Sequence, residues 1–292
     1  MRINVFYSLL IFSVFLIPIV GLSTNNIEPF DATVCQIVLG SEKDVIAQVE
    51  EAIITNPTSK LFIFPEYSTH GDNIKLSEIS YLKKNELARC KSIYWINLTP
   101  KFSKVKEVAD KYKKAIIIGC LEQVNNELRS RAYYYDSVEN TLEYYDKIHV
   151  HPNEIFLRPG NKLIPFNTRF GKIGILICYD MVFFETAKNL NLNGAEILVA
   201  IWAAAKRYSP KYNFRRILGA AIFNQYYILS ANLGYSNNCH MGGYSAILNP
   251  KADSLTLLLN DKFGYISAEI NLEEEKEWRT IEHYNSARKS VL

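Results

Sequence analysis

Residues 172–178 read KIGILIC, a short and mostly branched apolar run that ends in a cysteine. Runs of this length and composition are typical of strands that are buried on both faces. A helical pattern follows over residues 183–192, and a second apolar run covers residues 196–202. This order of strand, helix and strand predicts an α/β protein whose sheets are covered by helices.

The same alternation continues on both sides of this unit. Further strands are predicted at residues 32–39, 61–64, 115–120, 131–136, 142–146, 227–231, 243–248 and 264–270. Helices are predicted at residues 41–54 with Ser41 as the cap, at two segments between residues 74 and 112 that separate near Thr99-Pro100, and at residues 212–224. No linker interrupts residues 28–284, which are expected to form one domain before a short tail at residues 285–292.

The first residues form a leader of a different character. Arg2 precedes an almost uninterrupted apolar stretch at residues 5–22, and the small residues Gly21 and Ser23 suit cleavage before Thr24. Residues 1–23 are therefore predicted to be a signal peptide, and the mature protein to be secreted or periplasmic. The alternative is an uncleaved membrane anchor, since about 18 apolar residues just span a bilayer.

The charge of the chain is nearly balanced, with 33 basic and 30 acidic residues and a net charge of +3. The basic residues are scattered, which argues against a nucleic-acid partner. The five cysteines are an odd number, so at least one thiol stays free. Cys35 and Cys120 lie in apolar runs and are expected to be buried. The sequence does not decide whether Cys90 or Cys239 forms a disulfide. No spacing of Cys or His suggests a metal site.

Three reactive side chains each come directly after, or at the end of, a predicted buried strand: Glu66, Lys147 and Cys178. Strand ends are where α/β proteins assemble their sites. A thiol needs a base or a cation beside it to become a strong nucleophile. Glu66 would accept the proton of Cys178, while Lys147 and the backbone N–H of Tyr179 would stabilise negative charge on the substrate. Taken singly, each side chain has an ordinary alternative as a solvated or core residue.

The local sequences around these three residues are more specific than the residues alone. They read FPE at residues 64–66, YDKIH at 145–149 and ICYDM at 177–181, and in this order they resemble the three motifs of the nitrilase superfamily. The resemblance extends to residues 158–160, 194–199, 224–232, 242–250 and 267–272, and so covers about residues 31–280. Residues 220–224 depart from it, because they lack two charged residues that the family often carries there.

Membership of this superfamily implies a four-layer α-β-β-α sandwich with Glu66, Lys147 and Cys178 at the bottom of a pocket. It also implies a homodimer or larger homo-oligomer, and no metal or organic cofactor. Glu154 resembles the family's second glutamate, which hydrogen-bonds the lysine or the substrate. The alternative for Glu154 is a solvated loop carboxylate.

Cys178-Tyr179-Asp180 resembles the amidase and carbamoylase branches more than the true nitrilases. The resemblance therefore implies hydrolysis of a small amide or carbamoyl compound through a cysteine thioester, with release of ammonia or an amine. Tyr67, Tyr179 and Trp202 adjoin the strand ends and are expected to line the substrate pocket. Nitrile hydrolysis, acyl transfer by the same three residues and a non-catalytic binding protein of the same fold are the alternatives. A membrane partner is expected only if the leader is retained.

Overall fold

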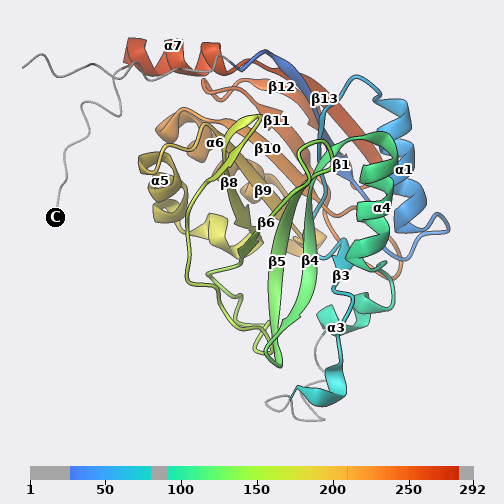
Figure 1. Ribbon diagram of the computed structural model, residues 1–292. Coiled ribbons are helices and arrows are strands. Elements are labelled where there is room, and N and C mark those ends of the chain that lie inside the picture. The colour runs from blue at the N-terminus through green and yellow to red at the C-terminus, as the bar shows by residue number, and fades with distance from the viewer. Residues whose placement is uncertain (1–26, 80–90, 209, 283–292) are drawn as a thin grey trace, which may run out of the picture.

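The computed structural model describes residues 27–79, 91–208 and 210–282 (Figure 1). The predicted signal peptide at residues 1–23, Cys90 and the tail at residues 285–292 lie outside the described residues. None of the helices in the described part of the chain has the length and apolar character needed to cross a bilayer.

Thirteen strands form two sheets within the described residues. The first sheet runs in the order β13-β1-β2-β4-β5-β6, with β3 paired to β4, and consists of β13 (Gly264–Ile270), β1 (Phe30–Gln36), β2 (Leu61–Ile63), β4 (Ala115–Val124), β5 (Glu127–Asp136), β6 (Thr141–Asp146) and β3 (Thr69–His70). The second runs in the order β12 (Ser254–Leu258), β11 (Ser245–Leu248), β10 (Tyr227–Asn232), β9 (Ile197–Trp202), β8 (Gly171–Ile177) and β7 (Phe166–Thr168).

Helices cover the outer face of each sheet (Figure 1). The α-helices are α1 (Val45–Thr55), α3 (Lys91–Ile96), α4 (Phe102–Tyr112), α5 (Phe184–Leu192), α6 (Pro210–Asn224) and α7 (Leu272–Glu282). In Figure 1, α1 and α4 lie on one side of the molecule, and α5 and α6 lie on the other. The predicted four-layer α-β-β-α sandwich is therefore confirmed.

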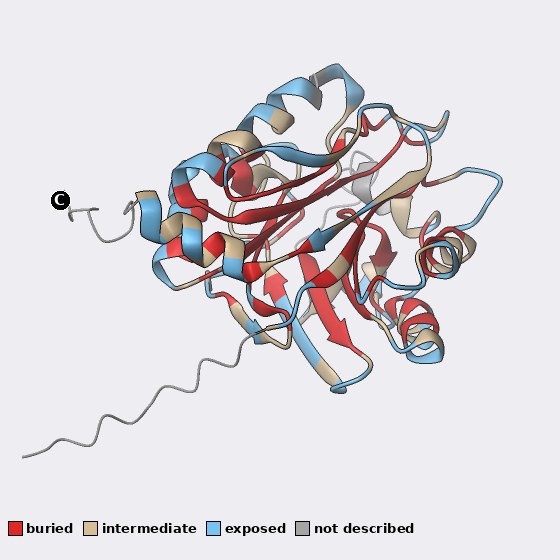
Figure 2. Ribbon diagram, turned by 90° about the horizontal axis from the view of Figure 1, so that it is seen from above, coloured by how far each residue is buried: buried red, intermediate tan, exposed pale blue. Residues whose placement is uncertain are grey.

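Alternating residues of the central strands pack on two different cores. Leu61 and Ile63 of β2 join the core between the two sheets, whereas Phe62 and Phe64 join the core beneath α1 and α4. Figure 2 shows the resulting buried strands at the centre of the molecule. Because both faces are covered, these strands read as continuous apolar runs rather than as alternating ones.

The pairing directions bring strand ends to one edge. β1, β2 and β4 are parallel, and β5 and β6 continue by two antiparallel pairings, so β6 runs in the direction of β2 and β4. β8 is parallel to β9, and β9 to β10, in the other sheet. The carboxyl ends of β2 and β6, after which Glu66 and Lys147 follow, consequently lie on the same edge of the first sheet.

Several sequence predictions were wrong in detail. The cap of α1 is Asp44, whose Oδ1 accepts a hydrogen bond from the N–H of Ala47 at 2.8 Å, while the Ser41 hydroxyl donates to the carbonyl oxygen of Lys43 at 2.7 Å. β3, β7, β12 and α7 were not predicted, because these elements are short or largely exposed. Residues 220–224 form the end of α6 without the two charges that the family often carries.

The cysteines that the structure describes are all free thiols. Cys35 and Cys120 are fully buried, as predicted, and Cys239 is buried as well. Burial raises the pKa of the Cys35 thiol well above its usual range, and no base or cation among the described residues lies beside this thiol to activate it. Cys178 differs from these three because it is only partly buried.

Candidate active site

Glu66 lies in a tight turn directly after β2. The N–H of Gly119 and the hydroxyl of Ser68 both donate to the carbonyl oxygen of Pro65, at 3.0 and 2.7 Å. Tyr67 has a left-handed backbone with φ of 59°, which is uncommon for an aromatic residue. The turn therefore fixes the direction in which the side chains of Glu66 and Tyr67 leave the strand.

Three donors hold the carboxylate of Glu66, which is 1% exposed. Lys147 Nζ lies 2.8 Å and Ser130 Oγ 3.0 Å from Oε1, and the N–H of Ala203 donates to Oε2 at 3.1 Å. These donors come from three places that are far apart in the sequence. Burial raises the pKa of Glu66, and the charge of Lys147 opposes this rise without cancelling it.

Lys147 follows β6 and is as buried as Glu66. Its backbone N–H donates to the carbonyl oxygen of Ser130 at 2.9 Å, and its Nζ lies 2.8 Å from both Glu66 Oε1 and Glu154 Oε2. Burial alone would lower the pKa of Lys147, but the two carboxylates outweigh burial and hold this pKa well above its usual range. Lys147 is therefore an ammonium ion clamped between two carboxyl groups.

Glu154 is the second carboxyl group on this ammonium. Besides Lys147, it accepts a hydrogen bond from the hydroxyl of Tyr67 at 2.7 Å and one from the N–H of His151 at 3.2 Å. Burial raises the pKa of Glu154, but Lys147 and these donors outweigh burial and lower it below its usual value. The environments thus push the pKa values of the two glutamates in opposite directions, as in enzymes that separate acid and base roles.

Cys178 directly follows β8 and opens a 3-10 turn over Cys178–Val182. Its φ of 47° is left-handed, so the thiol sits on a sharp turn rather than continuing the strand. Burial and the nearby Glu66 raise the pKa of Cys178 well above its usual range, while Lys147 lowers it in part. The resting thiol is therefore neutral, and it lies within electrostatic reach of both groups.

Asp180 connects the Cys178 turn to the segment that carries Lys147. The fully buried carboxylate of Asp180 accepts hydrogen bonds from the N–H of Ile177 at 3.1 Å, the N–H of His149 at 2.7 Å and the hydroxyl of Tyr145 at 2.8 Å. Because Tyr145 and His149 flank Lys147, one side chain couples the positions of the thiol and the ammonium. Asp180 lies in one of the three sequence motifs, but no role was predicted for it.

Comparison with known proteins identifies the family of the chain. Residues 32–280 match the family model of the carbon-nitrogen hydrolases. The chain belongs to the carbon-nitrogen hydrolase family. The predicted resemblance to the nitrilase superfamily is thereby confirmed.

Relatives of the chain include a probable nitrilase and an omega-amidase. A probable nitrilase of Schizosaccharomyces pombe is 28% identical over 84% of this chain and 88% of its own length. An omega-amidase of Saccharomyces cerevisiae is 24% identical over 70% of this chain and 72% of its own length. Among solved structures, a carbon-nitrogen hydrolase of Helicobacter pylori has a TM-score of 0.72 at 20% identity, covering 90% of this chain and 96% of that one.

The three aromatic residues predicted to line the pocket of the hydrolase occupy different environments. Tyr67 is 2% and Trp202 3% exposed, and the indole N–H of Trp202 donates to the hydroxyl of Ser230 at 2.9 Å. Tyr179 is only partly buried and lies between the rings of His151 and Phe183. Tyr179 therefore offers surface to a ligand, whereas Tyr67 and Trp202 offer almost none.

Position 119 requires glycine, because its backbone lies against the turn that carries Glu66. A Cβ atom at Gly119 would lie 2.4 Å from the Cα of Glu66. We expect Gly119→Ala to displace Glu66 and to lower kcat/KM by about a hundredfold, since catalysis depends on sub-ångström placement. Steady-state kinetics and thermal unfolding would measure both effects. Gly219→Ala is the matched control, because a Cβ there meets nothing within 4 Å, and unchanged kinetics in Gly119→Ala would contradict this account.

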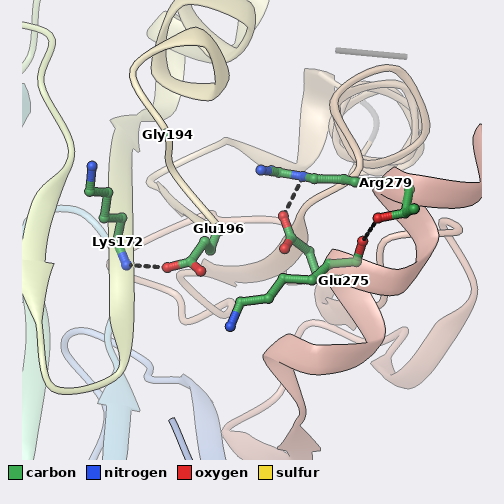
Figure 3. Close-up of a pocket in the computed structure, with 7 residues that line it drawn as sticks. Lys172, Gly194, Glu196, Glu275 and Arg279 are labelled. Carbon is green, nitrogen blue, oxygen red and sulfur yellow. Dashed lines mark hydrogen bonds and ion pairs between the residues drawn. The ribbon is translucent and has the colours of Figure 1, made fainter. Parts of the chain in front are cut away.

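A separate surface pocket of the hydrolase, of about 500 Å³, lies against α7 (Figure 3). Glu275 of α7 forms an ion pair with Arg279, and the backbone N–H of Lys172 donates to Glu196 at 2.8 Å. Burial raises the pKa of Glu275 to about 8. Lys172 is at the start of β8 and Cys178 follows its end, so this pocket and the thiol lie at opposite ends of one strand.

Proposed function

We propose that this protein hydrolyses the carbon–nitrogen bond of a small amide or carbamoyl compound through a thioester on Cys178. The observation that carries the proposal is the buried ion pair of Glu66 and Lys147, with the largely buried Glu154 on the same ammonium, beside the neutral thiol of Cys178, a residue that is only partly buried. A buried cation between two carboxyl groups with divergent pKa values is typical of a catalytic arrangement.

In the first half of the reaction, the sulfur of Cys178 attacks the carbonyl carbon while its proton passes to Glu66. A raised pKa suits Glu66 to this task, because a general base works best when its pKa approaches the working pH. Lys147 and the N–H of Tyr179 stabilise the oxyanion, and such donors typically contribute about 3 kcal/mol each. Glu66 then gives its proton to the nitrogen, and ammonia or an amine leaves as the thioester forms.

In the second half, water attacks the thioester carbonyl and gives a proton to Glu66. The tetrahedral intermediate collapses, the carbon–sulfur bond breaks, and Glu66 returns the proton to the sulfur of Cys178. The products are a carboxylic acid, or a carbamic acid from a carbamoyl substrate, and the regenerated thiol. Glu154 keeps its negative charge throughout and holds Lys147 protonated.

The proposal is tested by a screen for released ammonia or amine from amides, carbamoyl compounds and nitriles. Protein treated with iodoacetamide serves as the control, because alkylation of Cys178 removes the nucleophile. Release from an amide or carbamoyl compound that iodoacetamide abolishes would support the proposal. Release from nitriles alone, or release that survives alkylation, would contradict it.

We also propose that the protein forms a homodimer through the outer face of α5 and α6. These two neighbouring helices expose large apolar side chains, among them Phe184 at 74%, Leu192 at 57% and Ile222 at 48%. Several exposed large apolar side chains on neighbouring helices are typical of protein–protein contacts. An interface here would support the 3-10 turn of Cys178, because α6 contacts that turn.

We expect Leu192→Glu combined with Ile222→Glu to convert a dimer into monomers, since two buried carboxylates would oppose association. Light scattering after size-exclusion chromatography would measure the mass. Ile54→Glu is the matched control, because Ile54 is equally exposed at 57% but lies on α1, over the other sheet. A double variant that keeps the wild-type mass would exclude this interface.

A further inference from the structure

The hydroxyl of Tyr67 contacts Glu154, the second carboxylate of the site. Tyr67 Oη donates to Glu154 Oε1 at 2.7 Å, although the two residues are 87 positions apart. The ring is packed against Trp95, with ring centroids 5.0 Å apart, and only 2% of the residue is exposed. The side chain is thus held at both its ring and its hydroxyl.

The backbone conformation of Tyr67 also fixes the position of its side chain. A bulky residue with φ of 59° occupies a sparsely populated region, and such a conformation persists only where the surroundings hold it. The flanking turn supplies this support through the two hydrogen bonds to the carbonyl oxygen of Pro65. The left-handed residue therefore directs its ring beside Glu66 and toward Glu154.

The two carboxyl groups on Lys147 receive different partners. Glu154 accepts from Tyr67 and from the N–H of His151, whereas Glu66 accepts from Ser130 and from the N–H of Ala203. Both share the ammonium at 2.8 Å. Both carboxyl groups raise the pKa of the Cys178 thiol, but Glu66 contributes more than Glu154, and this difference favours Glu66 as the partner of the thiol.

We propose that Tyr67 is a positioning residue whose hydroxyl holds Glu154 as a fixed carboxylate against Lys147, leaving Glu66 as the proton acceptor. This inference rests on the proposed function, in which Glu66 takes the proton of Cys178. It replaces the expectation that Tyr67 contacts the substrate. Loss of the hydroxyl leaves a largely buried carboxylate oxygen without its donor, and that loss favours a protonated or displaced Glu154.

The direction of the hydrogen bond agrees with this role. Burial, together with the charges of Glu154 and Glu66, raises the pKa of Tyr67 well above its usual range. The phenol is therefore a neutral donor at every pH at which the enzyme would work. In return, this hydrogen bond is one of the contacts that lower the pKa of Glu154.

The test is Tyr67→Phe, which keeps the ring that packs on Trp95 and removes only the hydroxyl. We expect kcat to fall by about ten- to a hundredfold with KM changed less than about threefold, as for loss of a hydrogen bond to a charged group. The acid limb of the pH profile should move to higher pH, because Glu154 without its donor is protonated at a higher pH. Thermal unfolding would establish that Tyr67→Phe is folded.

Repeating Tyr67→Phe in a Glu154→Ala protein distinguishes a hydroxyl of Tyr67 that acts through Glu154 from one that contacts the substrate. In Glu154→Ala, the hydroxyl of Tyr67 has lost its partner, so adding Tyr67→Phe should change the rate by less than about twofold. Ser130→Ala is the matched control, because its hydroxyl donates to Glu66 and its effect should persist in Glu154→Ala. The rate of Cys178 alkylation by iodoacetamide gives a second readout in every variant.

The outcomes are distinguishable. A full effect of Tyr67→Phe in the Glu154→Ala background, or a change confined to KM, would overturn the positioning role and favour substrate contact. Unchanged kinetics, pH profile and alkylation in Tyr67→Phe would overturn it as well. If Cys178 of the wild-type protein is alkylated no faster than the buried cysteines, the proposed function itself fails.

Discussion

Replacing Cys178 with Ala is expected to lower turnover of the preferred substrate by at least about a thousandfold, which is typical for loss of a catalytic nucleophile. Without the sulfur no thioester forms, and the remaining groups only bind and polarise the carbonyl. The fold should persist, because Cys178 is partly exposed and its left-handed backbone is equally available to Ala. Turnover measured with the best compound from the amide screen would give the ratio.

Cys35→Ala is the matched control for this loss. Cys35 is a fully buried thiol in β1, and it packs in the core beneath α1 and α4. Its truncation should lower the free energy of unfolding by roughly 1–2 kcal/mol, as for other small core truncations, and leave kcat unchanged. If Cys178→Ala retains the activity of Cys35→Ala, another group is the nucleophile.

Replacing Lys147 with Met is expected to affect both activity and stability. Turnover should fall by about a thousandfold, because the oxyanion and the attacking sulfur lose their cation. The free energy of unfolding at neutral pH should fall by about 3–5 kcal/mol, since Glu66 and Glu154 become buried carboxylates without a counter-ion. Chemical denaturation followed by circular dichroism would measure the second effect.

The pH dependence of this variant has a definite sign. Without Lys147, burial raises the pKa of the two glutamates in the folded protein above that in the unfolded chain. Folding then favours the protonated carboxyl groups, so stability is retained at low pH and is lost as the pH rises. Lys147→Met should therefore be closer to wild type at about pH 5 than at pH 8.

A surface lysine provides the control for Lys147→Met. Lys104 forms an ion pair with Glu107 at 3.0 Å, and both side chains are more than half exposed. Lys104→Met should change the free energy of unfolding by less than about 1 kcal/mol and leave turnover unchanged. A Lys147→Met protein as stable and active as Lys104→Met would refute the assigned role of the buried ammonium.

Much of the fold could be predicted because the signal is local. The central strands read as continuous apolar runs, since the two sheets bury one face of each strand and helices bury the other. Exposed or short elements carry a weaker pattern, so β7, β12 and α7 were not predicted. The cap of α1 was misplaced because both Ser41 and Asp44 are residues that cap helices.

The partners of the site residues were less accessible to sequence reasoning. Ser130 has an unremarkable local pattern, and no role was predicted for Asp180 within its motif, yet their side chains hold Glu66 and the Cys178 turn. Tyr67 was expected to face the substrate because it adjoins Glu66, and the structure shows that its hydroxyl donates a hydrogen bond to Glu154. Such contacts depend on which strands become neighbours, and spacing along the chain does not contain that information.

The sequence by itself determined the α/β class and the resemblance to the nitrilase superfamily, and it predicted Glu66, Lys147 and Cys178 as the candidate catalytic residues. Each rests on a contiguous pattern: an apolar run, or a short motif at the end of one. Only the tertiary structure decided that Glu66 and Glu154 share one ammonium at 2.8 Å, and that their pKa values move in opposite directions. The physical reason is that charge interactions and burial depend on distance through space, which is set once the two sheets have packed together.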